Sequence, residues 1–148
     1  TFLRQGEVEM AALCLGYPYT ISGKVVPGVQ EGRKIGFPTA NLDTSNYGQL
    51  IPANGVYAVK ARLEQSIATL PAMMNIGMRP TFNGTDITLE THILNFSDDL
   101  YGKTLSVSFM HRIREEQKFD SPQDLMKQLQ HDRKMVVEQF EKDKDKDE

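Results

Sequence analysis

The sequence has very little cysteine and no long apolar segment, and both absences narrow what the chain can be. A single cysteine, Cys14, excludes an internal disulfide framework and a structural zinc site built from several thiolates. This cysteine usage suits a reducing compartment, so we expect a cytoplasmic protein. The apolar runs are far shorter than the roughly 20 residues that a membrane-spanning helix needs, so we expect no membrane association.

A basic surplus is also missing. The 148 residues include 17 basic and 20 acidic side chains, for a net charge of −3. Nucleic-acid binding usually needs an excess of positive charge, so we expect no nucleic-acid partner. The last eight residues, 141–148, hold three lysines and five acids, which is typical of a solvated, disordered tail. The rest of the chain is long enough for one domain with its own core.

Several common motifs are absent as well. The sequence has no G-x-x-x-x-G-K-[ST] phosphate loop, no G-x-G-x-x-G, no H-E-x-x-H and no G-x-S-x-G. An ATP-dependent enzyme with this sequence could therefore not be of the P-loop or protein-kinase type.

The pattern of the chain predicts a mainly β domain framed by two helices. Residues 5–15 are rich in helix formers and are followed by Gly16 and Pro18, which predicts a short helix. Helical patterns are then missing until residue 121, which favours an antiparallel barrel or sandwich over parallel β-α-β units. Short β-rich runs separated by turn residues are predicted at Thr20–Val26, Gly55–Leu63, Ile67–Ile76, Asp86–Phe96 and Thr104–Ile113.

The C-terminal part predicts a long amphipathic helix. Ser121 is suited to the N-cap position, with Pro122 in the first turn. One face is apolar at helical spacing, which predicts that the helix packs on the β domain. The residues of that face are Leu125, Leu129, Val136 and Phe140.

Residues 28–42 form the first stretch that could carry chemistry. It contains three glycines and the basic pair Arg33 and Lys34, so its backbone N–H groups could approach an anion closely. Pro38 favours an extended backbone, which would place the oxygens of Thr39 and Asn41 on one side. Oxygen ligands of this kind suit Mg²⁺ carried by a polyphosphate. The alternative is a glycine-rich hairpin with Thr and Asn in turn hydrogen bonds.

A second stretch, residues 86–96, alternates polar and apolar side chains. Successive side chains of a strand point to opposite faces. Glu90 and His92 therefore fall on the face opposite Ile87, Leu89 and Ile93. A carboxylate in the middle of a strand can act as a general base if it lines a cleft. On an exposed face it would be an ordinary solvated side chain, and His92 would more often be structural.

The third stretch, residues 112–121, connects the last predicted strand to the C-terminal helix. It carries Arg112 and Arg114 among other polar residues. Arginine is suited to stacking and to forked hydrogen bonds, so the segment could form a flap over a ligand. An exposed charged loop is the alternative.

Taken together, these stretches resemble the riboflavin kinase (flavokinase) family. The resemblance covers roughly residues 16–140, and it rests on motifs that occur in the family's order. They are GRKIGFPTANL (32–42), PANGVYA (52–58), NIGMRPTF (75–82), LETHI (89–93), FSDDLYG (96–102) and REEQKFDS (114–121).

The resemblance implies a six-stranded antiparallel Greek-key β-barrel with a C-terminal helix. It also implies an enzyme that transfers the γ-phosphoryl group of ATP to the 5′-hydroxyl of riboflavin, giving FMN and ADP. By resemblance, Glu90 is the catalytic base, and Thr39 and Asn41 hold Mg²⁺. The implied nucleotide contacts are Gly28, Arg33, Lys34, Ile93, Asn95 and Tyr101, and the implied flavin contacts are Arg114 and Gln117.

Residues 1–15 resemble the junction of the bacterial bifunctional riboflavin kinase/FMN adenylyltransferase, in which the adenylyltransferase module precedes the kinase. We therefore expect a junction segment at 1–15, a kinase domain at 16–140 and the charged tail at 141–148. The chain lacks the H-x-G-H of the other module, so we expect FMN but no FAD synthesis, and a monomer as a fragment. A flavin-binding barrel without turnover and a regulatory nucleotide-binding barrel are the alternatives.

Overall fold

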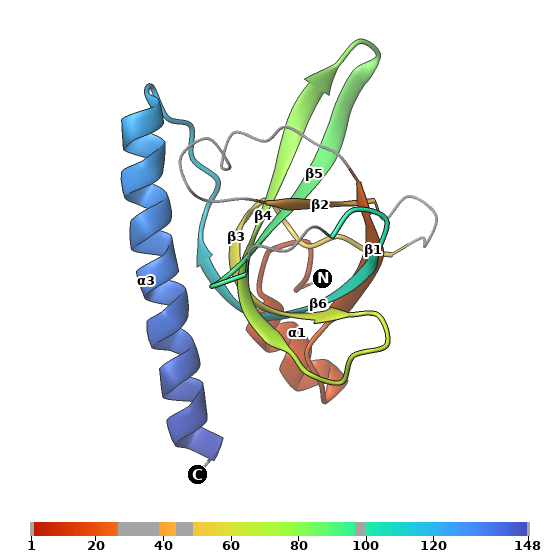
Figure 1. Cartoon of the computed structure of the whole chain (residues 1–148), viewed down its shortest axis with the longest axis vertical. Helices are drawn as coiled ribbons and strands as arrows, with labels where there is room; N and C mark the ends of the chain where they lie inside the picture. The colour runs from red at the N-terminus through yellow and green to blue at the C-terminus, as the bar shows by residue number, and fades with distance from the viewer. Residues whose placement is uncertain (1, 27–38, 44–48, 97–99, 148) are drawn as a thin grey trace.

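The computed structural model describes residues 2–26, 39–43, 49–96 and 100–147, which form a β-barrel with two helices (Figure 1). The strands alternate with turns rich in Gly, Pro and Asn, as expected for antiparallel pairing. Their bounds are β1 (Thr20–Val26), β2 (Ala40–Asp43), β3 (Gly55–Leu63), β4 (Leu70–Thr81), β5 (Gly84–Ile93) and β6 (Thr104–Arg114). The helices are α1 (Val8–Leu15) and α3 (Pro122–Asp147).

The six strands close in the order β1-β2-β5-β4-β3-β6, and every pair is antiparallel. β3, β4 and β5 follow one another as a meander, and β2 lies beside β5, which makes the topology a Greek key. Closure pairs each of the six described strands with two neighbours. The predicted six-stranded Greek-key barrel is therefore confirmed.

The barrel interior holds the main core. Inward side chains alternate with outward ones along each strand, and Tyr57, Phe109 and Met74 are fully buried. The rings of Tyr57 and Phe109 meet edge to face with centroids 5.2 Å apart. Burial raises the pKa of the Tyr57 phenol, while the nearby Arg112 guanidinium partly opposes that shift. The Tyr57 hydroxyl donates to the Ala53 carbonyl, so its polar end is satisfied at the end of the barrel.

α1 packs against the barrel beside β6, below that strand in the view of Figure 1, where Glu9 lies 3.2 Å from His111. Val8 and Ala11 of α1 belong to the barrel core. Gly16 ends the helix with φ of 84°, and its N–H bonds the Ala12 carbonyl. Glycine adopts this left-handed conformation without steric cost, so the predicted end of the helix is confirmed.

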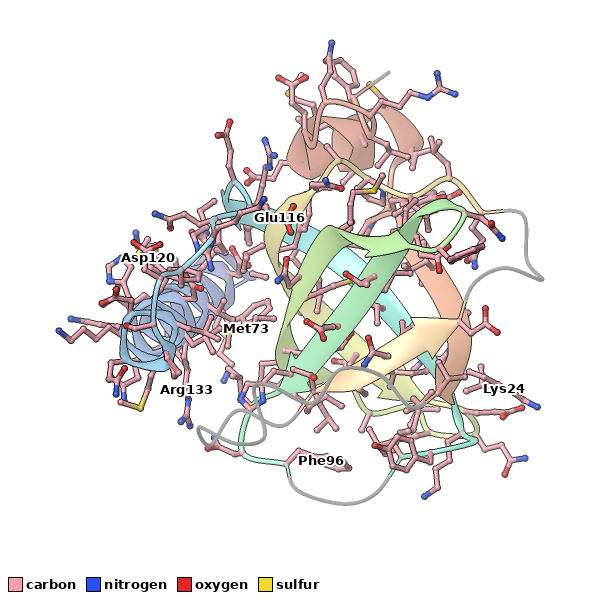
Figure 2. The ribbon with its side chains drawn as sticks, turned by 90° about the horizontal axis from the view of Figure 1, so that it is seen from above. Lys24, Met73, Phe96, Glu116, Asp120 and Arg133 are labelled. Carbon is pink, nitrogen blue, oxygen red and sulfur yellow. The ribbon has the colours of Figure 1, made fainter. Side chains whose placement is uncertain are left out.

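α3 lies along the outside of the barrel (Figure 1). The Ser121 hydroxyl accepts a hydrogen bond from the Asp124 N–H, which confirms the predicted N-cap. A second apolar cluster between α3 and the barrel is centred on Ala58, Met73 and Val136, and Figure 2 shows Met73 between the two. The predicted packing of this helix on the β domain is thus confirmed.

Several predicted boundaries differ from the structure. β4 begins at Leu70 instead of Ile67, because Gln65 has a turn conformation with φ of 68° and Ile67 is 99% exposed. β5 ends at Ile93 and β4 continues to Thr81, so the hairpin is displaced relative to the predicted runs. Where a disordered tail was predicted, α3 continues through Asp147, and Asp143 is held 2.8 Å from His111 on β6.

Among the residues that the structure describes, no helix is both long and apolar enough to cross a membrane.

Candidate active site

Three polar residues form a row across neighbouring strands. Asn41 of β2 pairs with Glu90 of β5, and Glu90 pairs in turn with Asn75 of β4. Residues directly opposite in an antiparallel pair lie on the same face, with Cβ atoms about 4.5–5.5 Å apart. The register therefore places the carboxylate of Glu90 between two carboxamides.

The row lies on the outer face of the barrel. Leu89 and Ile93 on β5 are buried in the core, so the alternation turns Glu90 outward, as the sequence predicts. All three side chains of the row are nevertheless partly buried. A partly buried carboxylate in this position could accept a proton from a hydroxyl bound beside it.

Thr39 and Asn41 provide oxygen atoms at one end of the row. Thr39 directly precedes β2, and Asn41 is its second residue. The Thr39 Oγ1 atom is buried and has no hydrogen-bond partner among the described residues. A buried hydroxyl without a partner is costly, and a cation would satisfy it. The residues present therefore fit an oxygen-liganded Mg²⁺.

Glu116, from the segment after β6, lies against β4 close to the row (Figure 2). A Cβ on Gly77 would be 2.5 Å from Glu116 Oε1 and 3.3 Å from Thr88 Oγ1. Gly77 thus leaves room for the Glu116 carboxylate where any other residue would displace it. The segment after β6 consequently covers part of the polar face, as expected for a flap.

Arg114, at the end of β6, is held by α3. Its Nε and NH2 groups donate to both carboxylate oxygens of Asp132 over 2.8–3.1 Å, and NH1 donates to the Glu115 carbonyl. Asp132 is fully buried and also accepts from Gln128. The Arg114 guanidinium lies 5.8 Å from the Phe119 ring centroid. These bonds fix the start of residues 115–121, and Gln117 is exposed on that segment.

Of the residues predicted near the nucleotide, those that the structure describes are Ile93, Asn95 and Tyr101. The Ile93 side chain is buried in the barrel core, whereas Asn95 is exposed with φ of 57°. Asn95 Oδ1 accepts a 2.7 Å hydrogen bond from Arg133 of α3, labelled in Figure 2. Tyr101, shortly before β6, is 40% exposed. The predicted contacts Gly28, Arg33 and Lys34 lie outside the described residues.

Two residues with a clear place in this region were missed by sequence reasoning. Asn75 interrupts the apolar run of residues 72–76, which is a detectable signal for a polar group in a packed strand. Asp132 falls on the apolar stripe of α3, at helical spacing between Leu129 and Val136. An acid on a packing face needs a buried partner, and Arg114 is that partner.

Comparison with known proteins agrees with this architecture. The family model "Flavokinase: Riboflavin kinase" matches residues 15–140. The bifunctional riboflavin kinase/FMN adenylyltransferase of Haemophilus influenzae is 43% identical over 130 residues, which cover 88% of this chain and 41% of that protein. The chain thus spans less than half the length of this curated relative.

Two solved structures are also similar. The structure titled macrolide-efflux protein from Streptococcus pneumoniae has a TM-score of 0.85 at 37% identity, covering 92% of this chain and 44% of that one. Riboflavin kinase from Trypanosoma brucei has a TM-score of 0.58 at 24% identity, covering 84% and 78%, and shares the fold. The family match over residues 15–140 and the 43% identity together establish that this chain belongs to the riboflavin kinase family.

Proposed function

We propose that the chain transfers the γ-phosphoryl group of ATP to the 5′-hydroxyl of riboflavin, giving FMN and ADP. The observation that carries the proposal is the pairing of Glu90 with Asn41 on one shielded outer face of the barrel. Family membership supports the substrate class. The arrangement offers a proton acceptor beside neutral oxygen ligands, which suits phosphoryl transfer because that reaction depends mainly on positioning and charge neutralisation.

Glu90 is assigned the role of base. Its carboxylate accepts the proton of the 5′-hydroxyl as the hydroxyl oxygen bonds to the γ-phosphorus. The bond between that phosphorus and the oxygen bridging to the β-phosphate breaks, and ADP leaves with the electron pair. Arg114 and Gln117 are assigned to the flavin, and Gly28, Arg33, Lys34, Ile93, Asn95 and Tyr101 to the nucleotide.

Thr39 and Asn41 would hold Mg²⁺ through the hydroxyl and carboxamide oxygens. When bound, the ion would neutralise charge on the nucleotide phosphates. The unpartnered Thr39 Oγ1 supports this assignment, because the protein gives that buried atom no other described partner. The Thr39 and Asn41 side chains would also orient the nucleotide relative to Glu90.

The adenylyltransferase activity named for the relatives is not assigned to this chain. The matched region covers 41% of the Haemophilus influenzae protein, and the present residues account for the kinase family model alone. We expect FMN to be the final product of this chain, with no conversion to FAD. In the full-length protein an adenylyltransferase module would be covalently linked to it.

The first test is FMN formation, followed by chromatography after the chain is mixed with riboflavin, ATP and Mg²⁺. FMN is expected to accumulate, FAD to be absent, and EDTA to abolish the reaction. A folded chain that quenches riboflavin fluorescence but forms no FMN would instead favour the flavin-binding barrel. Mg²⁺-independent turnover would contradict the metal assignment.

Asn41→Ala tests the metal-binding role. We expect the Mg²⁺ concentration needed for half-maximal activity to rise by on the order of 10–100-fold, because an oxygen ligand is lost. Riboflavin affinity should change little, as read by fluorescence quenching. Asn83→Ala, in the exposed turn of the β4–β5 hairpin, is the matched control. An unaltered Mg²⁺ dependence in Asn41→Ala would remove this residue from the metal site.

A further inference from the structure

Asn75 presents a buried polar atom that the protein leaves without a partner. Its Oδ1 is inaccessible to solvent and has no hydrogen-bond partner in the part of the chain that the structure describes. Buried carbonyl oxygens are nearly always hydrogen-bonded, so an unsatisfied one at a site calls for a specific reason. Folding alone would favour an apolar side chain at this position, because an apolar residue of similar shape avoids the desolvation cost.

The surroundings of Asn75 indicate what would satisfy it. Glu90 lies directly opposite on β5, and the Glu116 carboxylate lies over Gly77, two residues further along β4 on the same face. Carboxylates and a carboxamide oxygen are hydrogen-bond acceptors. A ligand with several hydroxyl donors in series complements such a face. Cross-strand neighbours about 4.5–5.5 Å apart at Cβ suit hydroxyls on nearby carbons of one chain.

We propose that Asn75 is a substrate-binding residue whose carboxamide oxygen accepts a hydrogen bond from a hydroxyl of a polyol chain, beside the hydroxyl at Glu90. The inference rests on the proposed function, since that function places the polyol chain of riboflavin at Glu90. Asn75 thereby aligns the chain so that its terminal hydroxyl reaches the carboxylate. The residue selects for a hydroxylated substituent and leaves the ring system to other contacts.

Asn75→Leu is expected to preserve or raise thermal stability while it weakens riboflavin binding. Leucine has a similar shape and removes the unsatisfied oxygen, so the melting temperature should rise or stay equal. The KM for riboflavin should rise by about 10-fold, because one hydrogen bond is lost. The KM for Mg·ATP should stay within about twofold. Asn83→Leu on the exposed hairpin turn controls for the added apolar surface.

A riboflavin KM within twofold of wild type in Asn75→Leu would overturn the proposal. So would an equal rise in the KM for Mg·ATP, because that indicates general damage to the site. Should the leucine variant not fold, Asn75→Ala takes its place, with the same expected rise in the KM for riboflavin and the same outcome against it.

Binding of two flavin probes separates this proposal from the proposed function. Lumiflavin carries a methyl group in place of the polyol chain, so the ratio of riboflavin to lumiflavin affinity, measured by fluorescence quenching, should fall about 10-fold in Asn75→Leu. An unchanged ratio overturns the role of Asn75 even if wild type makes FMN. If the wild-type chain makes no FMN but Asn75→Leu still lowers the ratio of riboflavin to lumiflavin affinity, the proposed function alone is overturned. A wild-type chain that does not bind riboflavin overturns both.

Discussion

Glu90→Gln is expected to lower kcat for FMN formation by about 10²–10⁴-fold, the usual contribution of a general base. Glutamine keeps the shape of the side chain and one acceptor oxygen, but it cannot take up the proton of the 5′-hydroxyl. Glu90 lies on the outer face of β5, so the barrel core should not be disturbed. Rates at saturating riboflavin and Mg·ATP measure the effect, and thermal unfolding confirms that the fold is retained.

Glu64→Gln is the matched control for this substitution. Glu64 is an exposed carboxylate in the turn after β3, away from the row formed by Asn41, Glu90 and Asn75. Its replacement should leave kcat unchanged. A Glu90→Gln enzyme that turns over within about threefold of wild type would show that phosphoryl transfer here depends on positioning alone, and that Glu90 is not the base.

Local pattern was enough to predict much of the fold. The bounds of β1 and β3 coincide with the predicted runs, because apolar alternation marks both strands, Pro18 and Pro27 flank β1, and polar turn residues follow Leu63. The cap of α3 at Ser121 follows from the same kind of local signal. β2 is different: it has four residues, too few for a periodic pattern, and its pairing with β1 and β5 defines it.

The arrangement of the candidate site depends on contacts between distant segments. Period two predicts that Glu90 faces outward, but only the register of β2, β5 and β4 shows that Asn41 and Asn75 flank it. Similarly, the flap segment was predicted from its charge, whereas its attachment through Arg114 to Asp132 on α3 is a tertiary feature. Strand register depends on the whole barrel closing, so local sequence alone does not specify it.

The attachment of the flap leads to the largest expected effect on stability. Asp132→Ala should lower the free energy of unfolding by about 3–5 kcal/mol, because it leaves the Arg114 guanidinium, 17% exposed, without its bidentate partner. For a domain of this size each kcal/mol lowers the melting temperature by roughly 2–4 °C. Thermal and urea unfolding measure the loss. Glu138→Gln, exposed on the same helix, should change stability by less than about 0.5 kcal/mol.

A double-mutant cycle distinguishes the ion pair from simple packing. Arg114→Met combined with Asp132→Leu replaces both charges by apolar groups, so the double variant should be more stable than either single variant. Additive losses would show that the two side chains contribute independently, contrary to their bonds of 2.8–3.1 Å. The double variant should nevertheless bind riboflavin more weakly than wild type, because Arg114 both anchors residues 115–121 and is proposed to contact the flavin. Recovered stability with lost flavin affinity would therefore indicate that this pair is retained for flavin binding more than for the stability of the barrel.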